Sequence, residues 1–187
     1  MITKARAFKT EAQLNTTIDY ITQSPKEKGI LKMIVARPEI DQRKVLTDGL
    51  LSKAVGLVGD NWKIKKSFSP PGPPHPEKQI TLMNARCIEM LATQEDEWPL
   101  AGDQLFVDFD LSEANLKPGD LLKIGATVEL KVSALPHNGC KKFAERFGTD
   151  AVKFVNSKLG KSLHLRGINA SVTQEGTIKK GDIISKK

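Results

Sequence analysis

The chain has 187 residues, of which 39% are hydrophobic and 27% are charged, with a formal net charge of +7. This length supports one domain with a real core. No apolar run approaches the roughly 18 residues of a membrane helix. The first eight residues, Met1–Phe8, carry charge but no apolar segment, so we expect no secretory signal. Cys87 and Cys140 lie far apart, and we expect two free thiols in a cytoplasmic, reducing compartment.

The positive charge is unevenly distributed along the chain. Residues 1–127 hold 17 Lys and Arg against 17 Asp and Glu, which sum to zero. Residues 128–187 hold 12 against 5, which sum to +7. A local positive field favours an anionic partner such as a phosphate, a pterin phosphate or a nucleic acid. A solvated basic surface is the alternative explanation of the same pattern.

The first half of the chain mixes predicted helices and strands. Residues 1–29 form a predicted N-terminal helical extension, in which Thr10 and Gln13 can form a capping box. Asn84 is a suitable N-cap for a second helix, and Cys87 within it is predicted to be a buried, small apolar residue. The segments in order are a helix over 10–22, a strand over 30–35, a helix or loop within 41–55, a strand over 79–83 and a helix over 84–92.

Polar and proline-rich segments separate these elements. Gly56–Trp62 reads as a turn, and no Gly-Lys-Ser/Thr follows it, so it is not a nucleotide-binding loop. Ser67–Pro76 holds five prolines and is predicted to be an extended surface connection. Glu95–Glu97 is predicted to be a solvated acidic loop. In a strand over 104–110, Asp108 and Asp110 would point to one face, and we expect that face to be exposed.

The second half is dominated by short strands. A hairpin is predicted over 121–124 and 126–132, and two short helices over 140–147 and 150–155. Further strands are predicted over 163–166 and 170–172, and a turn, strand and turn over 176–182. This series of short strands indicates a mainly β protein with a few helices (α+β), built as a barrel or sandwich with appended helices.

Cys140 is the strongest candidate for a chemical site. A thiol acts as a nucleophile or metal ligand only as the thiolate, and its pKa falls at helix N-termini and beside cations. Cys140 stands where a predicted turn becomes a helix, after Gly139, and Lys141, Lys142 and Arg146 follow it. Small and polar neighbours argue against inward packing. We therefore favour a functional thiolate over a merely structural cysteine.

The residue types nearby restrict what this thiolate can serve. Structural zinc needs four ligands, and only one cysteine is local. A Cys–His hydrolase needs an imidazole near the sulfur, and the local candidates are His137 and His164. A soft molybdenum or sulfur partner suits a lone thiolate. Single-stranded nucleic acid is disfavoured because the few aromatic residues do not interleave with the basic ones.

In several motifs the chain resembles the MOSC domain, named after the C-terminal domain of molybdenum cofactor sulfurases. The similarity runs over roughly residues 30–184. It rests on the order and spacing of motifs that are individually weak: Gly56–Asp60, Lys78–Leu82, Leu116–Gly125, Cys140 and Gly176–Asp182. Two positions depart from the family pattern. Many members have proline where Gly139 stands, and an Arg-Gly-Gly of some relatives is Arg166-Gly167-Ile168 here.

The resemblance implies a strongly bent β-barrel-like fold and a role for Cys140 in ligating molybdenum or carrying sulfur. It further implies cofactor-binding roles for Lys78, Lys141, Arg166, Asn169 and His137, with the basic residues holding the pterin phosphate. The expected partner is molybdenum cofactor (molybdopterin) or a sulfur donor protein, with no membrane.

The resemblance leaves the activity open. The chain lacks the pyridoxal-phosphate domain of full-length sulfurases, so we do not expect it to make its own persulfide. The leading hypothesis is a molybdenum-cofactor-binding protein that reduces N-hydroxylated compounds or carries the cofactor. The alternatives are a metal-free persulfide carrier and a non-enzymatic basic binding module. Whether the protein is an enzyme stays open at this point.

Overall fold

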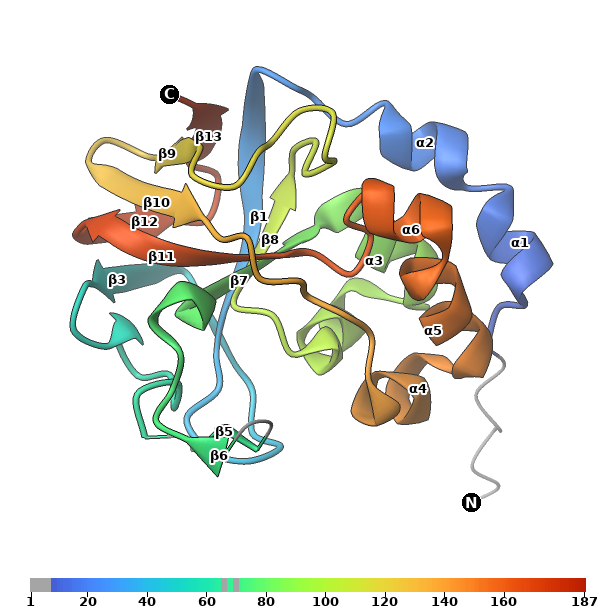
Figure 1. Ribbon diagram of the computed structural model, residues 1–187, viewed down its shortest axis with the longest axis horizontal. Coiled ribbons are helices and arrows are strands. Elements are labelled where there is room, and N and C mark those ends of the chain that lie inside the picture. The colour runs from blue at the N-terminus through green and yellow to red at the C-terminus, as the bar shows by residue number, and fades with distance from the viewer. Residues whose placement is uncertain (1–7, 65–66, 69–70) are drawn as a thin grey trace.

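A computed structural model describes residues 8–64, 67–68 and 71–187 (Figure 1). Its centre is a closed barrel, since strand pairing runs β13-β9-β10-β11-β7-β8-β1 and β1 pairs back with β13. Every pairing in this ring of seven strands is antiparallel except β7 with β8. The barrel strands are β1 (Lys28–Ala36), β7 (Ile80–Asn84), β8 (Leu105–Asp108), β9 (Leu121–Ile124), β10 (Val128–Val132), β11 (Ile168–Gln174) and β13 (Ile183–Lys186).

Shorter strands extend the barrel at its rim. β2 adds to the free part of β1, and β12, β3 and β4 form a small second sheet. Within the described residues, β5 and β6 pair with each other and with no further strand. Their bounds are β2 (Lys44–Leu46), β3 (Asp48–Ser52), β4 (Gly56–Leu57), β5 (Ser67–Phe68), β6 (Pro71–Gly72) and β12 (Gly176–Lys179).

The α-helices gather on one side of the barrel, whereas the short helix η1 lies apart from them, against β11 (Figure 1). Two helices, α3 and η2, lie in the crossover between the parallel strands β7 and β8, as a parallel pair requires. The bounds are α1 (Glu11–Asn15), α2 (Ile18–Thr22), η1 (Pro76–Lys78), α3 (Ala85–Leu91), η2 (Glu95–Ala101), α4 (Lys141–Phe147), α5 (Thr149–Asn156) and α6 (Lys158–Ser162). No helix of the described residues is long and apolar enough to cross a membrane.

Strand alternation builds two cores from the same strands. In β8, Leu105 and Val107 point into the barrel, while Phe106 between them joins the core beneath the helices. In β7, Leu82 and Met83 divide in the same way. The barrel wall is therefore apolar on both faces where helices cover it, and this double burial fixes α3, α4 and α5 against it.

The predicted fold class is confirmed, and so are most of the predicted elements. The Thr10 capping box and the Asn84 N-cap are present. The helix over 10–22 is divided into α1 and α2 at Thr16 and Thr17. Buried Cys87 is confirmed, and burial raises the pKa of its thiol to about 12.

Three predictions were wrong. Residues 41–55 hold strands β2 and β3, and the acidic loop at 95–97 begins the helix η2. Residues 163–166 are a turn after α6 and not a strand, whereas the strand expected at 170–172 is present as part of the longer β11. Residues 65–66 and 69–70, part of the proline-rich segment and its approach, lie outside the described residues.

Candidate functional site

The Cys140 thiol is exposed at the start of α4, where Cys140 is the N-cap residue. Its sulfur makes no capping hydrogen bond, so the side chain is not used to begin the helix. Asn156 of α5 holds the preceding peptide on both sides. Gly139 N donates to Asn156 Oδ1 at 2.9 Å, and Asn156 Nδ2 donates to Gly139 O at 3.0 Å.

This clamp gives a physical reason for glycine at the position where relatives have proline. Proline has no N–H to donate to Asn156. A Cβ on Gly139 would also lie 3.0 Å from Val155 Cγ2. Glycine at position 139, where many relatives have proline, therefore fits this chain, because the side-chain amide of Asn156 holds the backbone just before Cys140.

Directly before the clamp, His137 enters a buried polar cluster with Asp103, Arg166 and Asn169. Arg166 Nη1 donates to Asp103 Oδ2 at 2.5 Å, and Arg166 Nη2 donates to Ala101 O at 2.9 Å. Asn169 Nδ2 donates to the carbonyls of Leu135 and Pro136 at 3.1 and 3.2 Å. These bonds fix the strap of residues 133–140 against β11 and η2.

The cluster leaves three buried polar atoms without a hydrogen-bond partner among the described residues: Asp103 Oδ1, His137 Nε2 and Arg166 Nε. Asp103 Oδ1 and His137 Nε2 are 3.3 Å apart, but they are not aligned for a hydrogen bond. Because the Asn169 amide donates to two carbonyls, its Oδ1 is the atom that faces His137 Nδ1, at 3.4 Å. The neutral ring then carries its proton on Nδ1, and two acceptors face each other.

Burial, with Arg166 as the next cause, lowers the pKa of His137 from 6.5 to about 4. Between these values an unfolded histidine binds a proton and the folded one does not, so stability falls as the pH falls from 6.5 to 4. A shift of this size corresponds to about 3 kcal/mol of lost unfolding free energy at pH 4. Urea unfolding at several pH values measures this loss.

A matched pair of variants isolates the contribution of His137. In His137→Gln this part of the pH dependence should disappear. In His75→Gln it should remain, because His75 is an exposed N-cap of η1. Identical pH profiles for the wild type and His137→Gln would contradict the burial of a neutral imidazole.

Three arginines meet near Gly102, and one of them, Arg146, lies six residues after Cys140 on α4. A Cβ on Gly102 would lie 3.7 Å from Arg43 Nη2 and 3.9 Å from Arg146 Nη1. Arg37 reaches the same corner, where Nη1 donates to Gly102 O at 2.8 Å. We call Arg37, Arg43 and Arg146 the arginine cluster.

The three guanidinium groups are unequally neutralised. Arg37 forms a bidentate pair with the buried Asp60. Arg146 Nη2 donates to the exposed Asp41 at 2.7 Å, a carboxylate that it shares with Lys142. Arg43 hydrogen-bonds only backbone carbonyls among the described residues, those of Pro99 and Gln42. Burial and the neighbouring arginines lower the pKa of Arg43. The cluster therefore carries surplus positive charge.

The Gly56–Asp60 turn, one of the motifs in the sequence, ends in a carboxylate that accepts several hydrogen bonds. Besides Arg37, its carboxylate accepts from the Trp62 N–H at 2.9 Å and from Gln104 Nε2 at 3.4 Å. Gln104 Oε1 in turn accepts from Thr81 Oγ1 at 2.6 Å. The turn thus supplies the buried anion that holds Arg37 in the cluster.

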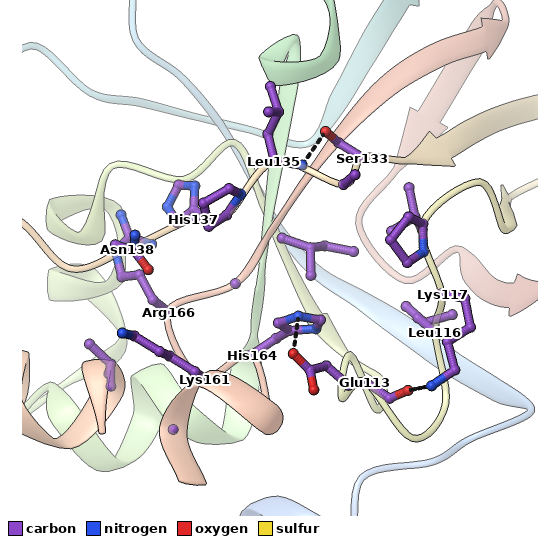
Figure 2. A pocket seen from close by; sticks show the side chains of 18 residues that line it. Glu113, Leu116, Lys117, Ser133, Leu135, His137, Asn138, Lys161, His164 and Arg166 are labelled. Carbon is purple, nitrogen blue, oxygen red and sulfur yellow. Dashed lines mark hydrogen bonds and ion pairs between the residues drawn. The ribbon is translucent and has the colours of Figure 1, made fainter. Parts of the chain in front are cut away.

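Beside the cluster of His137 and Arg166 lies a cavity of about 510 Å³ (Figure 2). It is bounded by the strap before Cys140, by the turn after α6 and by the loop of residues 113–118. Pro136, His137, Asn138 and Arg166 line it, whereas Cys140 does not.

The structure brings together only some of the predicted site residues. His137, Arg166 and Asn169 meet in one buried cluster. Lys141 follows Cys140 directly and is exposed, and Lys78 is exposed on η1, which lies against β11. Neither lysine lines the cavity. Their roles toward a cofactor stay predictions.

Sequence reasoning missed Asp103, Arg43 and Asn156. Asp103 and Arg43 lie far from Cys140 in sequence, and folding brings them beside Arg166 and Arg146. Arg146 was named as a cation after Cys140, but its proximity to Arg43 was not foreseen. No group of three or more metal-ligating side chains occurs among the described residues.

Comparison with known proteins agrees with this architecture. The family model of the MOSC domain matches residues 74–185, and the chain belongs to that family. No curated protein matches the sequence.

Solved structures show the same fold at low sequence identity. The YuaD protein of Bacillus subtilis is 17% identical with a TM-score of 0.64, over 84% of this chain and 94% of YuaD. YiiM of Escherichia coli is 17% identical with a TM-score of 0.53, over 84% of this chain and 69% of YiiM. YiiM of Geobacillus stearothermophilus is also 17% identical, with a TM-score of 0.51, over 87% and 73% of the two chains.

Proposed function

We propose that this protein binds molybdenum cofactor, with the Cys140 thiolate as the protein ligand of molybdenum. The main observation behind this proposal is that the Cys140 thiol is exposed at the start of the helix that carries Lys142 and Arg146. Arg146 belongs to the arginine cluster, which has an excess of positive charge. Molybdenum is a soft partner for which a thiolate is a suitable ligand. The family association with the cofactor supports the same choice.

The described residues fit the separate chemical parts of such a cofactor. Arg43 and Arg146 would hold its phosphate, since planar guanidinium groups bind phosphate oxygens in pairs. The unpartnered atoms of Asp103, His137 and Arg166 offer acceptors and a donor to the polar groups of a pterin ring. Lys141 and Lys78 would add charge from the surface, as the sequence analysis expected.

When bound, the cofactor would supply two-electron redox chemistry, which suits reduction of N-hydroxylated compounds; carriage of the cofactor would use the same contacts. The residues of this chain would position the thiolate, balance the charge of the phosphate and hydrogen-bond the pterin. Asn156 fixes the peptide before Cys140. The neutral His137 stays a proton acceptor at neutral pH, because its pKa is about 4.

Replacing Cys140 with alanine tests the ligand assignment. In a host that makes the cofactor, the purified Cys140→Ala protein should retain at least about tenfold less molybdenum than the wild type, since even outer-shell changes cost that much. Cys87→Ala is the matched control, because Cys87 is buried in the second core. Equal molybdenum in wild type and Cys140→Ala would refute the assignment.

A metal-free persulfide carrier is the second candidate, favoured by the exposure of the same thiol. Cys140 would then accept sulfane sulfur from a cysteine desulfurase, whose own persulfide is the donor. Intact mass spectrometry after incubation with a desulfurase and cysteine should show one added sulfur, absent in Cys140→Ala. Sulfur transfer to a protein that never retains molybdenum would favour this candidate over the first.

A further inference from the structure

The cavity beside the strap has the size and lining of a small-molecule site. Its volume of about 510 Å³ lies within the range of roughly 300–1,000 Å³ typical of ligand pockets. Apolar side chains such as Leu116, Val132 and Ile168 line it together with a few polar ones. Cys140 and the arginine cluster are not among the lining residues, whereas His137 and Arg166 are, so the cavity adjoins the polar cluster assigned to the pterin but does not include the proposed molybdenum ligand.

His164 stands in this cavity on a backbone that favours glycine. Its φ of +48° makes it one of two non-glycine residues with positive φ in the described chain. It occupies the position after the end of α6, where His164 N donates to Lys161 O at 3.1 Å and Leu165 N to Gly160 O at 2.8 Å. Glycine is the usual residue at this place in such a motif. A histidine here indicates that its side chain is used.

The hydrogen bonds of His164 direct one ring nitrogen into the cavity. Nδ1 lies 2.6 Å from Leu111 O, and because a carbonyl only accepts, Nδ1 carries the proton. Nε2 of the neutral ring is then an acceptor, and the nearest carboxylate oxygen, Glu113 Oε1, is 3.9 Å away. Figure 2 shows the ring in the middle of the cavity with Glu113 beside it. A ligand hydroxyl group that donates a hydrogen bond would suit these two acceptors.

Lys161 supplies a positive charge to the same cavity. Its ammonium group has no hydrogen-bond or ion-pair partner in the part of the chain that the structure describes, and it lines the cavity. In Figure 2 its side chain extends toward Asn138 and Arg166. The charge of Arg166 is already paired with Asp103. Lys117 also lines the cavity, but its ammonium group donates to the Glu113 carbonyl, so Lys161 is the lysine there whose ammonium is not engaged by a described residue.

We propose that the cavity binds a small hydroxycarboxylic acid with an apolar body. Lys161 contacts its carboxylate, and His164 Nε2 with Glu113 accepts from its hydroxyl group. The apolar body lies against Leu116, Val132 and Ile168. This proposal does not depend on cofactor binding, since no residue of it belongs to the cofactor assignment.

Three probes of one shape test it by NMR titration of the full-length protein. Mandelate carries the ring, the carboxylate and the hydroxyl group, phenylacetate lacks the hydroxyl group, and mandelamide lacks the charge. Mandelate should shift the backbone amides of Ala134, Lys161 and His164. Mandelate should bind about tenfold more tightly than either analogue, because one charge-assisted hydrogen bond typically raises the affinity by about that factor.

Variants separate recognition from structure. Lys161→Gln should weaken mandelate about tenfold, and Lys158→Gln, an exposed lysine on the same helix, should not. His164→Gly keeps a relaxed backbone and should make mandelate and phenylacetate bind equally. A Cys140→Ala background should change none of these values, so failure of the cofactor proposal would leave the result intact. Absence of shifts at the cavity amides, or equal affinity in Lys161→Gln, would overturn the proposal.

Discussion

Replacing Asp103 with alanine is expected to lower the free energy of unfolding by about 3–5 kcal/mol, the usual result of removing one partner of a buried ion pair. Asp103 is fully buried, and its only cationic hydrogen-bond partner in the described chain is Arg166. Without the carboxylate, the Arg166 guanidinium stays buried against the Phe143 ring, 4.8 Å from its centroid. Urea unfolding of the two proteins measures the difference.

A double variant distinguishes a buried charge from a simple cavity. Asp103→Ala combined with Arg166→Met removes the orphaned charge and should recover part of the loss. Asp41→Ala is the matched control, because its carboxylate also binds an arginine but is 61% exposed. Its effect should be far smaller. An Asp103→Ala protein as stable as the wild type would show that the pair contributes nothing to the fold.

Gly167→Ala is expected to be as damaging, at more than about 3 kcal/mol, because it combines backbone strain with overlap in a packed barrel wall. Gly167 has φ +108°, and an added Cβ would lie 2.2 Å from the Leu82 carbonyl oxygen. Leu82 pairs with Ile168 across β7 and β11, so neither backbone can yield without opening the barrel. Thermal unfolding with circular dichroism measures the loss.

Gly119 offers the control for this prediction. It has a similar φ of +93°, but nothing lies within 4 Å of its added Cβ. Gly119→Ala should therefore cost only the conformational strain, about 1–2 kcal/mol. Equal effects at the two glycines would mean that strain alone explains both, and that the contact with Leu82 is unimportant.

Period-2 alternation and turn residues are local signals, and they predicted a mainly β barrel or sandwich. The barrel itself was implied by the resemblance to the MOSC domain. β9 and β10 were recognisable from apolar alternation around Gly125. β2 and β3 were not, because β2 is a short, largely exposed strand whose pairing with β1 depends on the rim of the finished barrel. Residues 163–166 were mistaken for a strand since the left-handed His164 has no sequence signal.

The candidate site was predictable only in its local part. Cys140 with the basic helix after it can be read from one stretch of sequence. The charge count assigned all surplus charge to residues 128–187. The arginine cluster instead draws Arg37 and Arg43 from the neutral portion of the chain, because folding brings β1 and β2 to α4. Charge summed along a sequence cannot report which charges are already paired.

The molybdenum and pterin content of the freshly purified wild-type protein tests the central claim most directly. Expressed in a host that makes molybdenum cofactor, the protein should contain both in amounts approaching one per chain, because in the proposed function Cys140 and the arginine cluster would hold the two ends of one ligand. Elemental analysis and fluorescence of the oxidised pterin give the two numbers. Near-zero values for both, from a folded protein in a competent host, would contradict the account.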